Sequence, residues 1–231
     1  MIKLDLQYFG GRGASGGGGG AGAKGELVLP NGSKIEFTGT LHYDGDDKAL
    51  TGASRQTIVS WEDKRRGAKI EYAYATDANG NPIGKEVRGG KGSVSMPYTF
   101  HMAETSTHIH PRGDGMLGGT FSTADLTNFA NFGNTTKRAA AKEGTYSITK
   151  GKNFDASGFK QYVTKQNSDC RSRYVANANA LTKKVQAGKM SYSDYQLASA
   201  KAFNTYLVEC HNAYRNGQKT YGYTYTLEKT N

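Results

Sequence analysis

The chain has 231 residues, which is enough for one substantial hydrophobic core, so we expect a single folded domain with an appendage at most. It contains no apolar run long enough to span a bilayer, which excludes an integral helical membrane protein. The formal net charge of +10 suggests a nucleic-acid partner. However, the basic residues are scattered without a continuous stripe, as in 64–66, 137–138 and 183–184. A solvated basic surface is therefore preferred, and nucleic-acid binding is kept as the weaker alternative.

Residues 1–25 are expected to be a flexible leader, and residues 26–231 the folded domain. The first nine residues alternate apolar and polar side chains with Asp5 among them, so they lack the apolar centre of a secretory signal. Residues 10–25 are mostly Gly, Ala and Ser and cannot bury enough apolar surface to offset the entropy lost on ordering. We therefore expect a protein that is made and retained in a cytosol.

Residues 4–13, Leu-Asp-Leu-Gln-Tyr-Phe-Gly-Gly-Arg-Gly, carry a first resemblance. They resemble the leader of head-associated proteins in phages and prophages of Gram-positive bacteria. The resemblance implies a bacterial host cytoplasm, attachment to phage head proteins and possible packaging in the virion. The alternative is a tail with no role.

Alternating apolar residues predict strands through the first half of the domain. Residues 27–37 are predicted to form a hairpin around Pro-Asn-Gly, because Asn-Gly supplies the positive φ angles of tight turns. Residues 40–56 are polar and indicate a loop, and residues 68–87 predict a second hairpin around Asp-Ala-Asn-Gly-Asn-Pro. Residues 106–110 form a further expected strand, which Pro111 ends because proline cannot donate to a ladder.

Helices dominate the second half. Ser122 is a suitable N-cap for a helix whose apolar face includes Leu126 and Phe129, and residues 144–149 predict a strand that returns to the sheet. A helical hairpin is expected at about 155–216 and a final strand at about 219–228. This order predicts an α/β (α+β) fold with a mixed sheet flanked by helices.

Cys170 and Cys210 lie on the two expected helices of the hairpin. They would be able to pair if these helices are antiparallel, but buried reduced thiols are preferred because nothing else indicates an oxidising compartment. No C-x-x-C motif is present, so these cysteines are not expected to bind metal.

His108 and His110 are the first candidate metal ligands. Two histidines one residue apart point to the same side of an extended strand, so both rings can reach one ion. A carboxylate on the following helix, Asp125, would complete three ligands and leave the fourth tetrahedral position of a zinc ion open. Ser122 and Asp125 also have a simpler explanation as the start of a helix, because they match a capping box and an acidic residue there interacts with the helix dipole.

His108-Ile109-His110-Pro111 followed by Ser122-Thr123-Ala124-Asp125 resembles the His-x-His-Pro…Ser-x-x-Asp signature of JAMM (MPN-plus) zinc metalloproteases. The resemblance implies a JAMM-like fold, zinc ligation by the two histidines and Asp125, and a role for Ser122 in stabilising the oxyanion. Ile109 stands where Ser or Thr is commoner. The connection from Pro111 to Ser122 is longer than usual, and both departures affect the rim of the site rather than its ligands.

The resemblance also implies a glutamate on an earlier strand that activates the zinc-bound water. Five glutamates are candidates: Glu36, Glu62, Glu71, Glu86 and Glu104. Glu71 is preferred because it opens a strand in an order that resembles the glutamate-bearing hairpin of JAMM-like proteins, and Glu86 is the second choice. The remaining histidines, His42, His101 and His211, are interpreted as structural or surface residues.

These observations lead to one functional hypothesis with an alternative. The first is a zinc peptidase or isopeptidase that acts on a protein or a ubiquitin-like conjugate, with Glu71 as base and Ser122 as oxyanion donor. The second is a non-catalytic head-associated or delivered phage protein that retains the fold. No membrane partner is expected.

Overall fold

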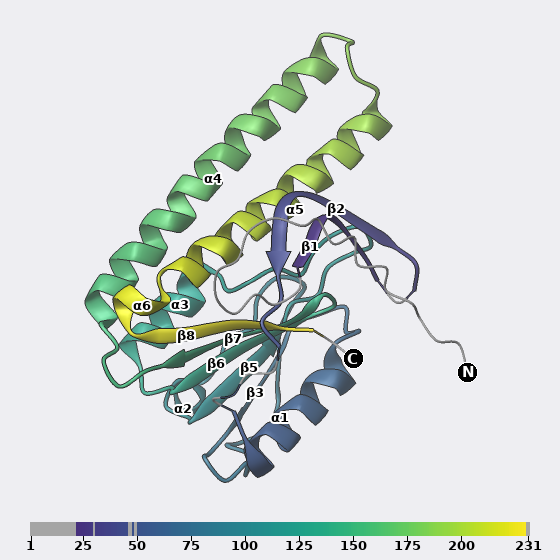
Figure 1. Ribbon diagram of the computed structural model, residues 1–231. Helices are drawn as coiled ribbons and strands as arrows, with labels where there is room; N and C mark the ends of the chain where they lie inside the picture. The colour runs from purple at the N-terminus through teal and green to yellow at the C-terminus, as the bar shows by residue number, and fades with distance from the viewer. Residues whose placement is uncertain (1–21, 30, 46–47, 49, 230–231) are drawn as a thin grey trace.

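The computed structural model describes residues 22–29, 31–45, 48 and 50–229 (Figure 1). In these residues the chain forms eight strands and six helices: β1 (Gly22–Val28), β2 (Lys34–His42), α1 (Gly52–Arg65), β3 (Tyr72–Thr76), β4 (Val87–Arg88), α2 (Tyr98–His101), β5 (Thr105–Ile109), α3 (Thr123–Asn131), β6 (Thr136–Ala141), β7 (Gly144–Lys150), α4 (Ala156–Gln186), α5 (Tyr192–Asn216), α6 (Gln218–Tyr221) and β8 (Tyr223–Glu228).

A six-stranded mixed sheet with the order β4-β3-β5-β6-β7-β8 forms the centre of the fold. β5 and β6 are parallel, whereas every other neighbouring pair is antiparallel. Parallel neighbours need a crossover connection, and α3 provides it. The N-terminus of α3 therefore lies near the end of β5.

Helices cover both faces of this sheet. α1 packs against β3 and β5 on one face. On the other face, side chains of α3, α4 and α5 join those of β6, β7 and β8 in the main hydrophobic core, as Leu126, Phe159 and Tyr146 illustrate. The β1–β2 hairpin forms a separate two-stranded sheet that packs on α5.

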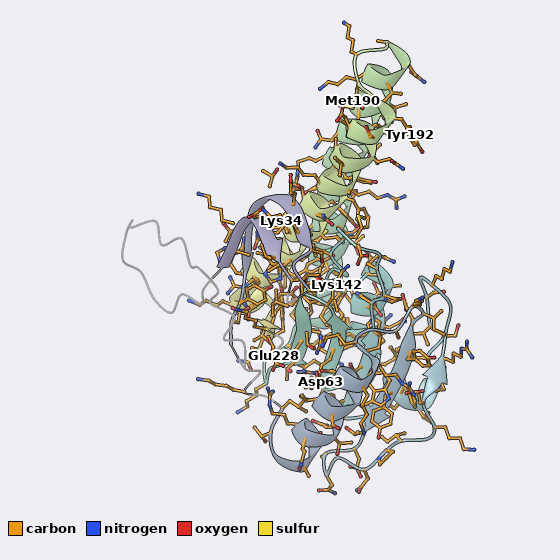
Figure 2. The ribbon with its side chains drawn as sticks, turned by 90° about the vertical axis from the view of Figure 1, so that its right-hand side faces the viewer. Lys34, Asp63, Lys142, Met190, Tyr192 and Glu228 are labelled. Atoms are coloured by element: carbon orange, nitrogen blue, oxygen red, sulfur yellow. The ribbon has the colours of Figure 1, made fainter. Side chains whose placement is uncertain are left out.

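α4 and α5 form a long antiparallel arm that extends beyond the sheet (Figure 1). Figure 2 shows Met190 and Tyr192 near the far end of the arm, well away from Asp63 and Glu228. The buried residues of α4 end at Cys170, and those of α5 begin at Asn204. Only the inner half of the arm therefore belongs to the core.

The α/β class, the mixed sheet flanked by helices, the helical hairpin and the final strand are confirmed. The 27–37 hairpin is present as β1–β2, and Gly32 adopts the expected positive φ of 82°. The second hairpin is present as β3–β4. The histidine strand is β5, and the helix capped by Ser122 is α3.

Residues 40–56 were wrongly expected to be a loop, because β2 continues to His42 and α1 begins at Gly52. α1 has no side-chain cap at Thr51, and its buried residues are Ser54, Ile58 and Glu62. Two of these three are polar, so this helix lacks the apolar periodicity that predicts a buried face.

The leader was expected to extend to residue 25, but β1 already begins at Gly22. Main-chain pairing with β2 orders these glycine-rich residues, and the register shifts between Lys24 and Glu26, where Gly25 has a φ of 78°. The proposed phage-type motif at residues 4–13 and the rest of residues 1–21 lie outside the described residues.

Lys137 and Arg138 were interpreted as part of a scattered basic surface, and this was wrong. Both lie in β6, where every residue is buried, and their exposed fractions are 1% and 0%. Buried lysine and arginine need polar or charged partners, and both residues have them here. These two basic residues therefore do not belong to the surface.

Candidate metal centre

The three predicted ligands come together where β5 ends and α3 begins. His108 lies within β5, His110 lies one residue beyond it, and Asp125 is in the first turn of α3. The backbone N–H of His110 donates to the Ala140 carbonyl at 2.9 Å, so the extended conformation continues past the strand end. Both imidazoles therefore project to the face of the sheet that α3 covers.

The ligand atoms of these side chains face a common point. The Nε2 atoms of His108 and His110 are 2.8 Å apart, and His108 Nε2 lies 3.5 Å from Asp125 Oδ2. In the group as a whole these atoms lie within 4.8 Å of one another. Two ligands of a tetrahedral zinc ion are roughly 3.3 Å apart, given bonds of about 2.0–2.1 Å. The group can hold a metal ion after the two rings separate slightly.

The orientation of His110 is set by a backbone carbonyl. Its Nδ1 lies 2.9 Å from the Gly119 oxygen and therefore carries the proton, which leaves the lone pair of Nε2 for a metal. Burial and the neighbouring His108 lower the pKa of His110 to about 4. The ring is neutral at physiological pH, as metal ligation requires.

Asp125 performs both of the roles that its sequence position suggested. The Ser122 hydroxyl accepts a hydrogen bond from the Asp125 backbone N–H, and Asp125 Oδ2 accepts from the backbone N–H of Ser122, which completes a capping box. Burial acts to raise the pKa of Asp125, but His108 and Lys137 outweigh it and hold the pKa well below its usual value. An ionised carboxylate thus faces the two histidines.

Ser122 is exposed, and its hydroxyl also donates to Asp125 Oδ2 at 2.7 Å. A serine hydroxyl has a single proton, so this hydrogen bond must be exchanged before Ser122 can donate to a substrate oxyanion. The predicted role of Ser122 therefore requires a rotation of its side chain.

Lys137 is a charged neighbour of the centre that the sequence analysis missed. Its Nζ lies 3.5 Å from Asp125 Oδ1 and 3.8 Å from Met96 Sδ. The ammonium holds the outer carboxylate oxygen and leaves Oδ2 directed at the histidines. Its sequence signal is weak, because only the pairing of Lys137 with Ser106 in β5 places it beside the site.

Glu71 lies immediately before β3 and interacts electrostatically with His108 and Asp125. Ala73 pairs with His108, and Glu71, two residues earlier, exchanges backbone hydrogen bonds with Gly89 and Gly90, so the extended chain directs Glu71 to the same face as Ala73. Only 7% of the residue is exposed. Burial raises the pKa of Glu71 and Asp125 adds to the rise, while the electrostatic interactions with His108 and Arg112 oppose it. A carboxyl with a raised pKa beside candidate metal ligands suits general-base chemistry.

The other candidate glutamates are engaged elsewhere. Glu62 pairs with Arg138 on the opposite face of the sheet, and Glu86 accepts from Trp61 and Arg65. Glu36 and Glu104 are exposed. The structure therefore brings only Glu71 of the five to the histidines.

The remaining histidines and the cysteines do not join this group. His211 is fully buried and contacts the Tyr225 hydroxyl and the His42 carbonyl, each at 3.0 Å. Cys170 and Cys210 are buried free thiols on α4 and α5. In the described part of the chain, His108, His110 and Asp125 are the one group of three such side chains arranged to bind a metal.

No known protein family, curated protein or solved structure matches this chain. None of the helices formed by the described residues is both long enough and apolar enough to cross a membrane.

Proposed function

We propose that this chain is a zinc-dependent peptidase or isopeptidase of JAMM type that hydrolyses an amide or isopeptide bond in a protein or a ubiquitin-like conjugate. The observation that carries the proposal is the convergence of His108, His110 and Asp125 on one point, with Glu71 beside them. A helix start alone accounts for Asp125, but it does not account for two imidazole nitrogens that face each other 2.8 Å apart.

In this mechanism His108, His110 and Asp125 would hold the ion, which would supply a Lewis acid and lower the pKa of a coordinated water to about 7. Glu71 takes the proton of the attacking water and returns it to the leaving amine. Its raised pKa favours the first transfer, because this carboxylate accepts a proton more readily than that of an exposed glutamate does. Ser122 turns from Asp125 toward the developing oxyanion, and loss of one such donor commonly costs about 10²–10³ in rate.

Metal content and cleavage test the proposal together. The wild-type protein is expected to bind about one zinc per chain, measured by elemental analysis after dialysis, and to cleave a proteome-derived peptide library or a ubiquitin-like conjugate, followed by mass spectrometry. His108→Ala is expected to lose zinc, whereas Glu71→Gln keeps zinc and loses cleavage. His42→Ala and Glu104→Gln are matched controls, because both residues lie outside the group. Unchanged zinc content in His108→Ala would contradict the site assignment.

We propose a second candidate, a non-catalytic head-associated or delivered phage protein, because Asp125 already has partners that do not involve a metal. Ser122 occupies Oδ2 and Lys137 lies beside Oδ1, so the centre is also a complete helix-capping and ion-pair cluster. Absence of zinc from the wild-type protein, together with an unchanged fold in His108→Ala, would favour this candidate.

The proposed setting is the host bacterial cytoplasm, with possible packaging in the phage virion. This part of the proposal is supported by the leader motif at residues 4–13.

A further inference from the structure

Glu143 lies in the turn between β6 and β7, and its carboxylate is buried with three donors. Oε2 accepts from the backbone N–H of Gly118 at 3.0 Å, and Oε1 accepts from the backbone N–H of Gly119 at 2.7 Å. The Tyr146 hydroxyl donates to Oε1 at 3.0 Å. With an exposed fraction of 2%, this is a negative charge that fixes two consecutive peptide groups of the loop between β5 and α3.

Gly119 connects this carboxylate to the metal centre. Its N–H is held by Glu143, while its carbonyl oxygen lies 2.9 Å from His110 Nδ1. Gly119 has a φ of 86°, a conformation that L residues with side chains rarely adopt. The two hydrogen-bonding groups of one residue thus face Glu143 on one side and His110 on the other.

The loop also runs close to β6 at this point. A Cβ atom added to Gly118 would lie 2.4 Å from the Ala141 Cβ and 2.9 Å from the His110 carbonyl oxygen. Glycine is therefore needed for the loop to reach Glu143, and the loop has little room to move toward the strand. Glu143 accepts hydrogen bonds from the N–H groups of Gly118 and Gly119, while the Asn204 side chain holds the backbone of Gly115 and Leu117 earlier in the loop.

We propose that Glu143 is a positioning residue for the metal centre, acting through the Gly118–Gly119 backbone to orient the imidazole of His110. The inference rests on the proposed function in one respect, namely that His110 binds zinc. Partners that orient a metal ligand typically contribute 10–100-fold to metal affinity. The negative charge of Glu143 also favours a nearby cation, so both effects predict weaker zinc binding when the carboxylate is removed.

The test compares the wild-type full chain with Glu143→Ala, Glu143→Gln and Tyr146→Phe. Zinc affinity is measured by competition with a chromophoric chelator, and the visible spectrum of the Co²⁺-loaded protein reports coordination geometry. The tautomer of His110 in the metal-free protein is measured at neutral pH by ¹⁵N NMR of the imidazole.

Glu143→Ala is expected to bind zinc about 10–100-fold more weakly, to change the Co²⁺ spectrum and to lose the uniform Nδ1–H tautomer of His110. Glu143→Gln is expected to be intermediate, because one carbonyl oxygen remains as an acceptor, and it carries the test if the alanine variant does not fold. Tyr146→Phe is the matched control and should stay near wild type, since both backbone N–H bonds to Glu143 survive.

The outcomes separate this inference from the proposed function. If the wild-type protein binds no zinc, the proposed function fails, and the NMR measurement still decides whether Glu143 orients His110. If Glu143→Ala and Glu143→Gln fold, bind zinc as tightly as wild type and keep the Nδ1–H tautomer, Glu143 has only a structural role and the inference is overturned.

Discussion

Lys137 and Arg138 are consecutive residues of β6 whose buried side chains project to opposite faces of the six-stranded sheet. Lys137 reaches Asp125 on the face of the candidate metal centre. Arg138 contacts Glu62 at 2.8 Å and Glu228 at 2.9 Å on the face that α1 covers. β6 therefore supplies one cation, Lys137, to the candidate site and a second cation, Arg138, to the buried ion pairs on the opposite face of the sheet.

Arg138→Met is expected to lower the free energy of unfolding by about 3–5 kcal/mol, because it leaves Glu62 buried without the arginine that compensates its charge. Equilibrium denaturation with urea at neutral pH measures the change. Zinc binding by the protein that remains folded should be close to wild type, since Arg138 lies on the face opposite to the candidate ligands.

Arg55→Met provides the control for this prediction. Arg55 also contacts Glu228, at 2.9 Å, but its side chain is 27% exposed, so the expected loss is about 1 kcal/mol or less. If the two substitutions lowered the free energy of unfolding equally, the buried ion pairs of Arg138 would not contribute more to stability than the partly exposed pair of Arg55.

Acid should destabilise the protein partly through His211. Burial, and then the charge of Arg215, lower the pKa of His211 to about 3 in the folded protein, whereas the unfolded chain has the ordinary value of 6.5. The unfolded state then binds more protons below pH 6.5, and stability falls as the pH is lowered toward 3. By pH 5, protonation of His211 in the unfolded state should lower the free energy of unfolding by about 2 kcal/mol.

His211→Gln is expected to be less stable than wild type at pH 7.5, because the hydrogen bonds to Tyr225 and the His42 carbonyl are altered. It should nevertheless lose less stability than wild type between pH 7.5 and pH 5. The measurement is the urea-unfolding free energy at several pH values. Parallel curves for the two proteins would mean that His211 is not responsible for the acid sensitivity.

The parts of the fold that were predicted from sequence are those with strong local signals. Ser122 and Asp125 are three residues apart at the start of an apolar helical pattern, and they form the expected capping box. His108 and His110 have strand spacing and lie together at the end of β5. The convergence of these three side chains was thus predictable, because a strand end and a helix start identify both sides of the candidate site.

The errors occurred where tertiary pairing determines the structure. β6 contains Lys137 and Arg138, which look like surface residues until their carboxylate partners on α1, α3 and β8 are known. α1 was missed for the same reason, since its buried Glu62 is explained by partners far away in the sequence, Arg138 in β6 and Thr107 in β5. Local patterns do not reveal a charge that is compensated by a residue far away in the sequence.

Glu71→Gln is expected to stabilise the metal-free protein at neutral pH by roughly 0.5–2 kcal/mol, a range typical of single stabilising substitutions. The variant removes the cost of burying an ionised carboxylate. Burial raises the pKa of Glu71 in the folded state, so the folded protein binds more protons than the unfolded chain just above pH 4.5. Wild-type stability therefore falls as the pH rises through the folded pKa, whereas the glutamine variant does not titrate.

Thermal or urea unfolding of the two metal-free proteins at pH 4 and pH 7 tests the predicted difference in stability. The variant should be more stable than wild type at pH 7, and the difference should shrink at pH 4. Glu104→Gln is a suitable control because Glu104 is exposed. A glutamine variant that is less stable at pH 7 would mean that the ionised carboxylate of Glu71 is favourable in the folded protein.

Asp125→Asn separates the two roles of Asp125, because an amide oxygen can still accept from the Ser122 backbone but carries no charge. As a helix-capping residue, Asp125 contributes about 0.3–1 kcal/mol through the helix dipole, with a further contribution from the ion pair with Lys137. As a metal ligand it should contribute far more than the 10–100-fold typical of an outer partner. We therefore expect a moderate loss of stability in the metal-free protein and a loss of more than about 100-fold in zinc affinity. Ser122→Ala, which removes the cap but keeps the carboxylate, is the control: it should show a comparable loss of stability with a much smaller change in zinc affinity. If Asp125→Asn bound zinc as tightly as wild type, Asp125 would be a helix-capping residue and not a metal ligand.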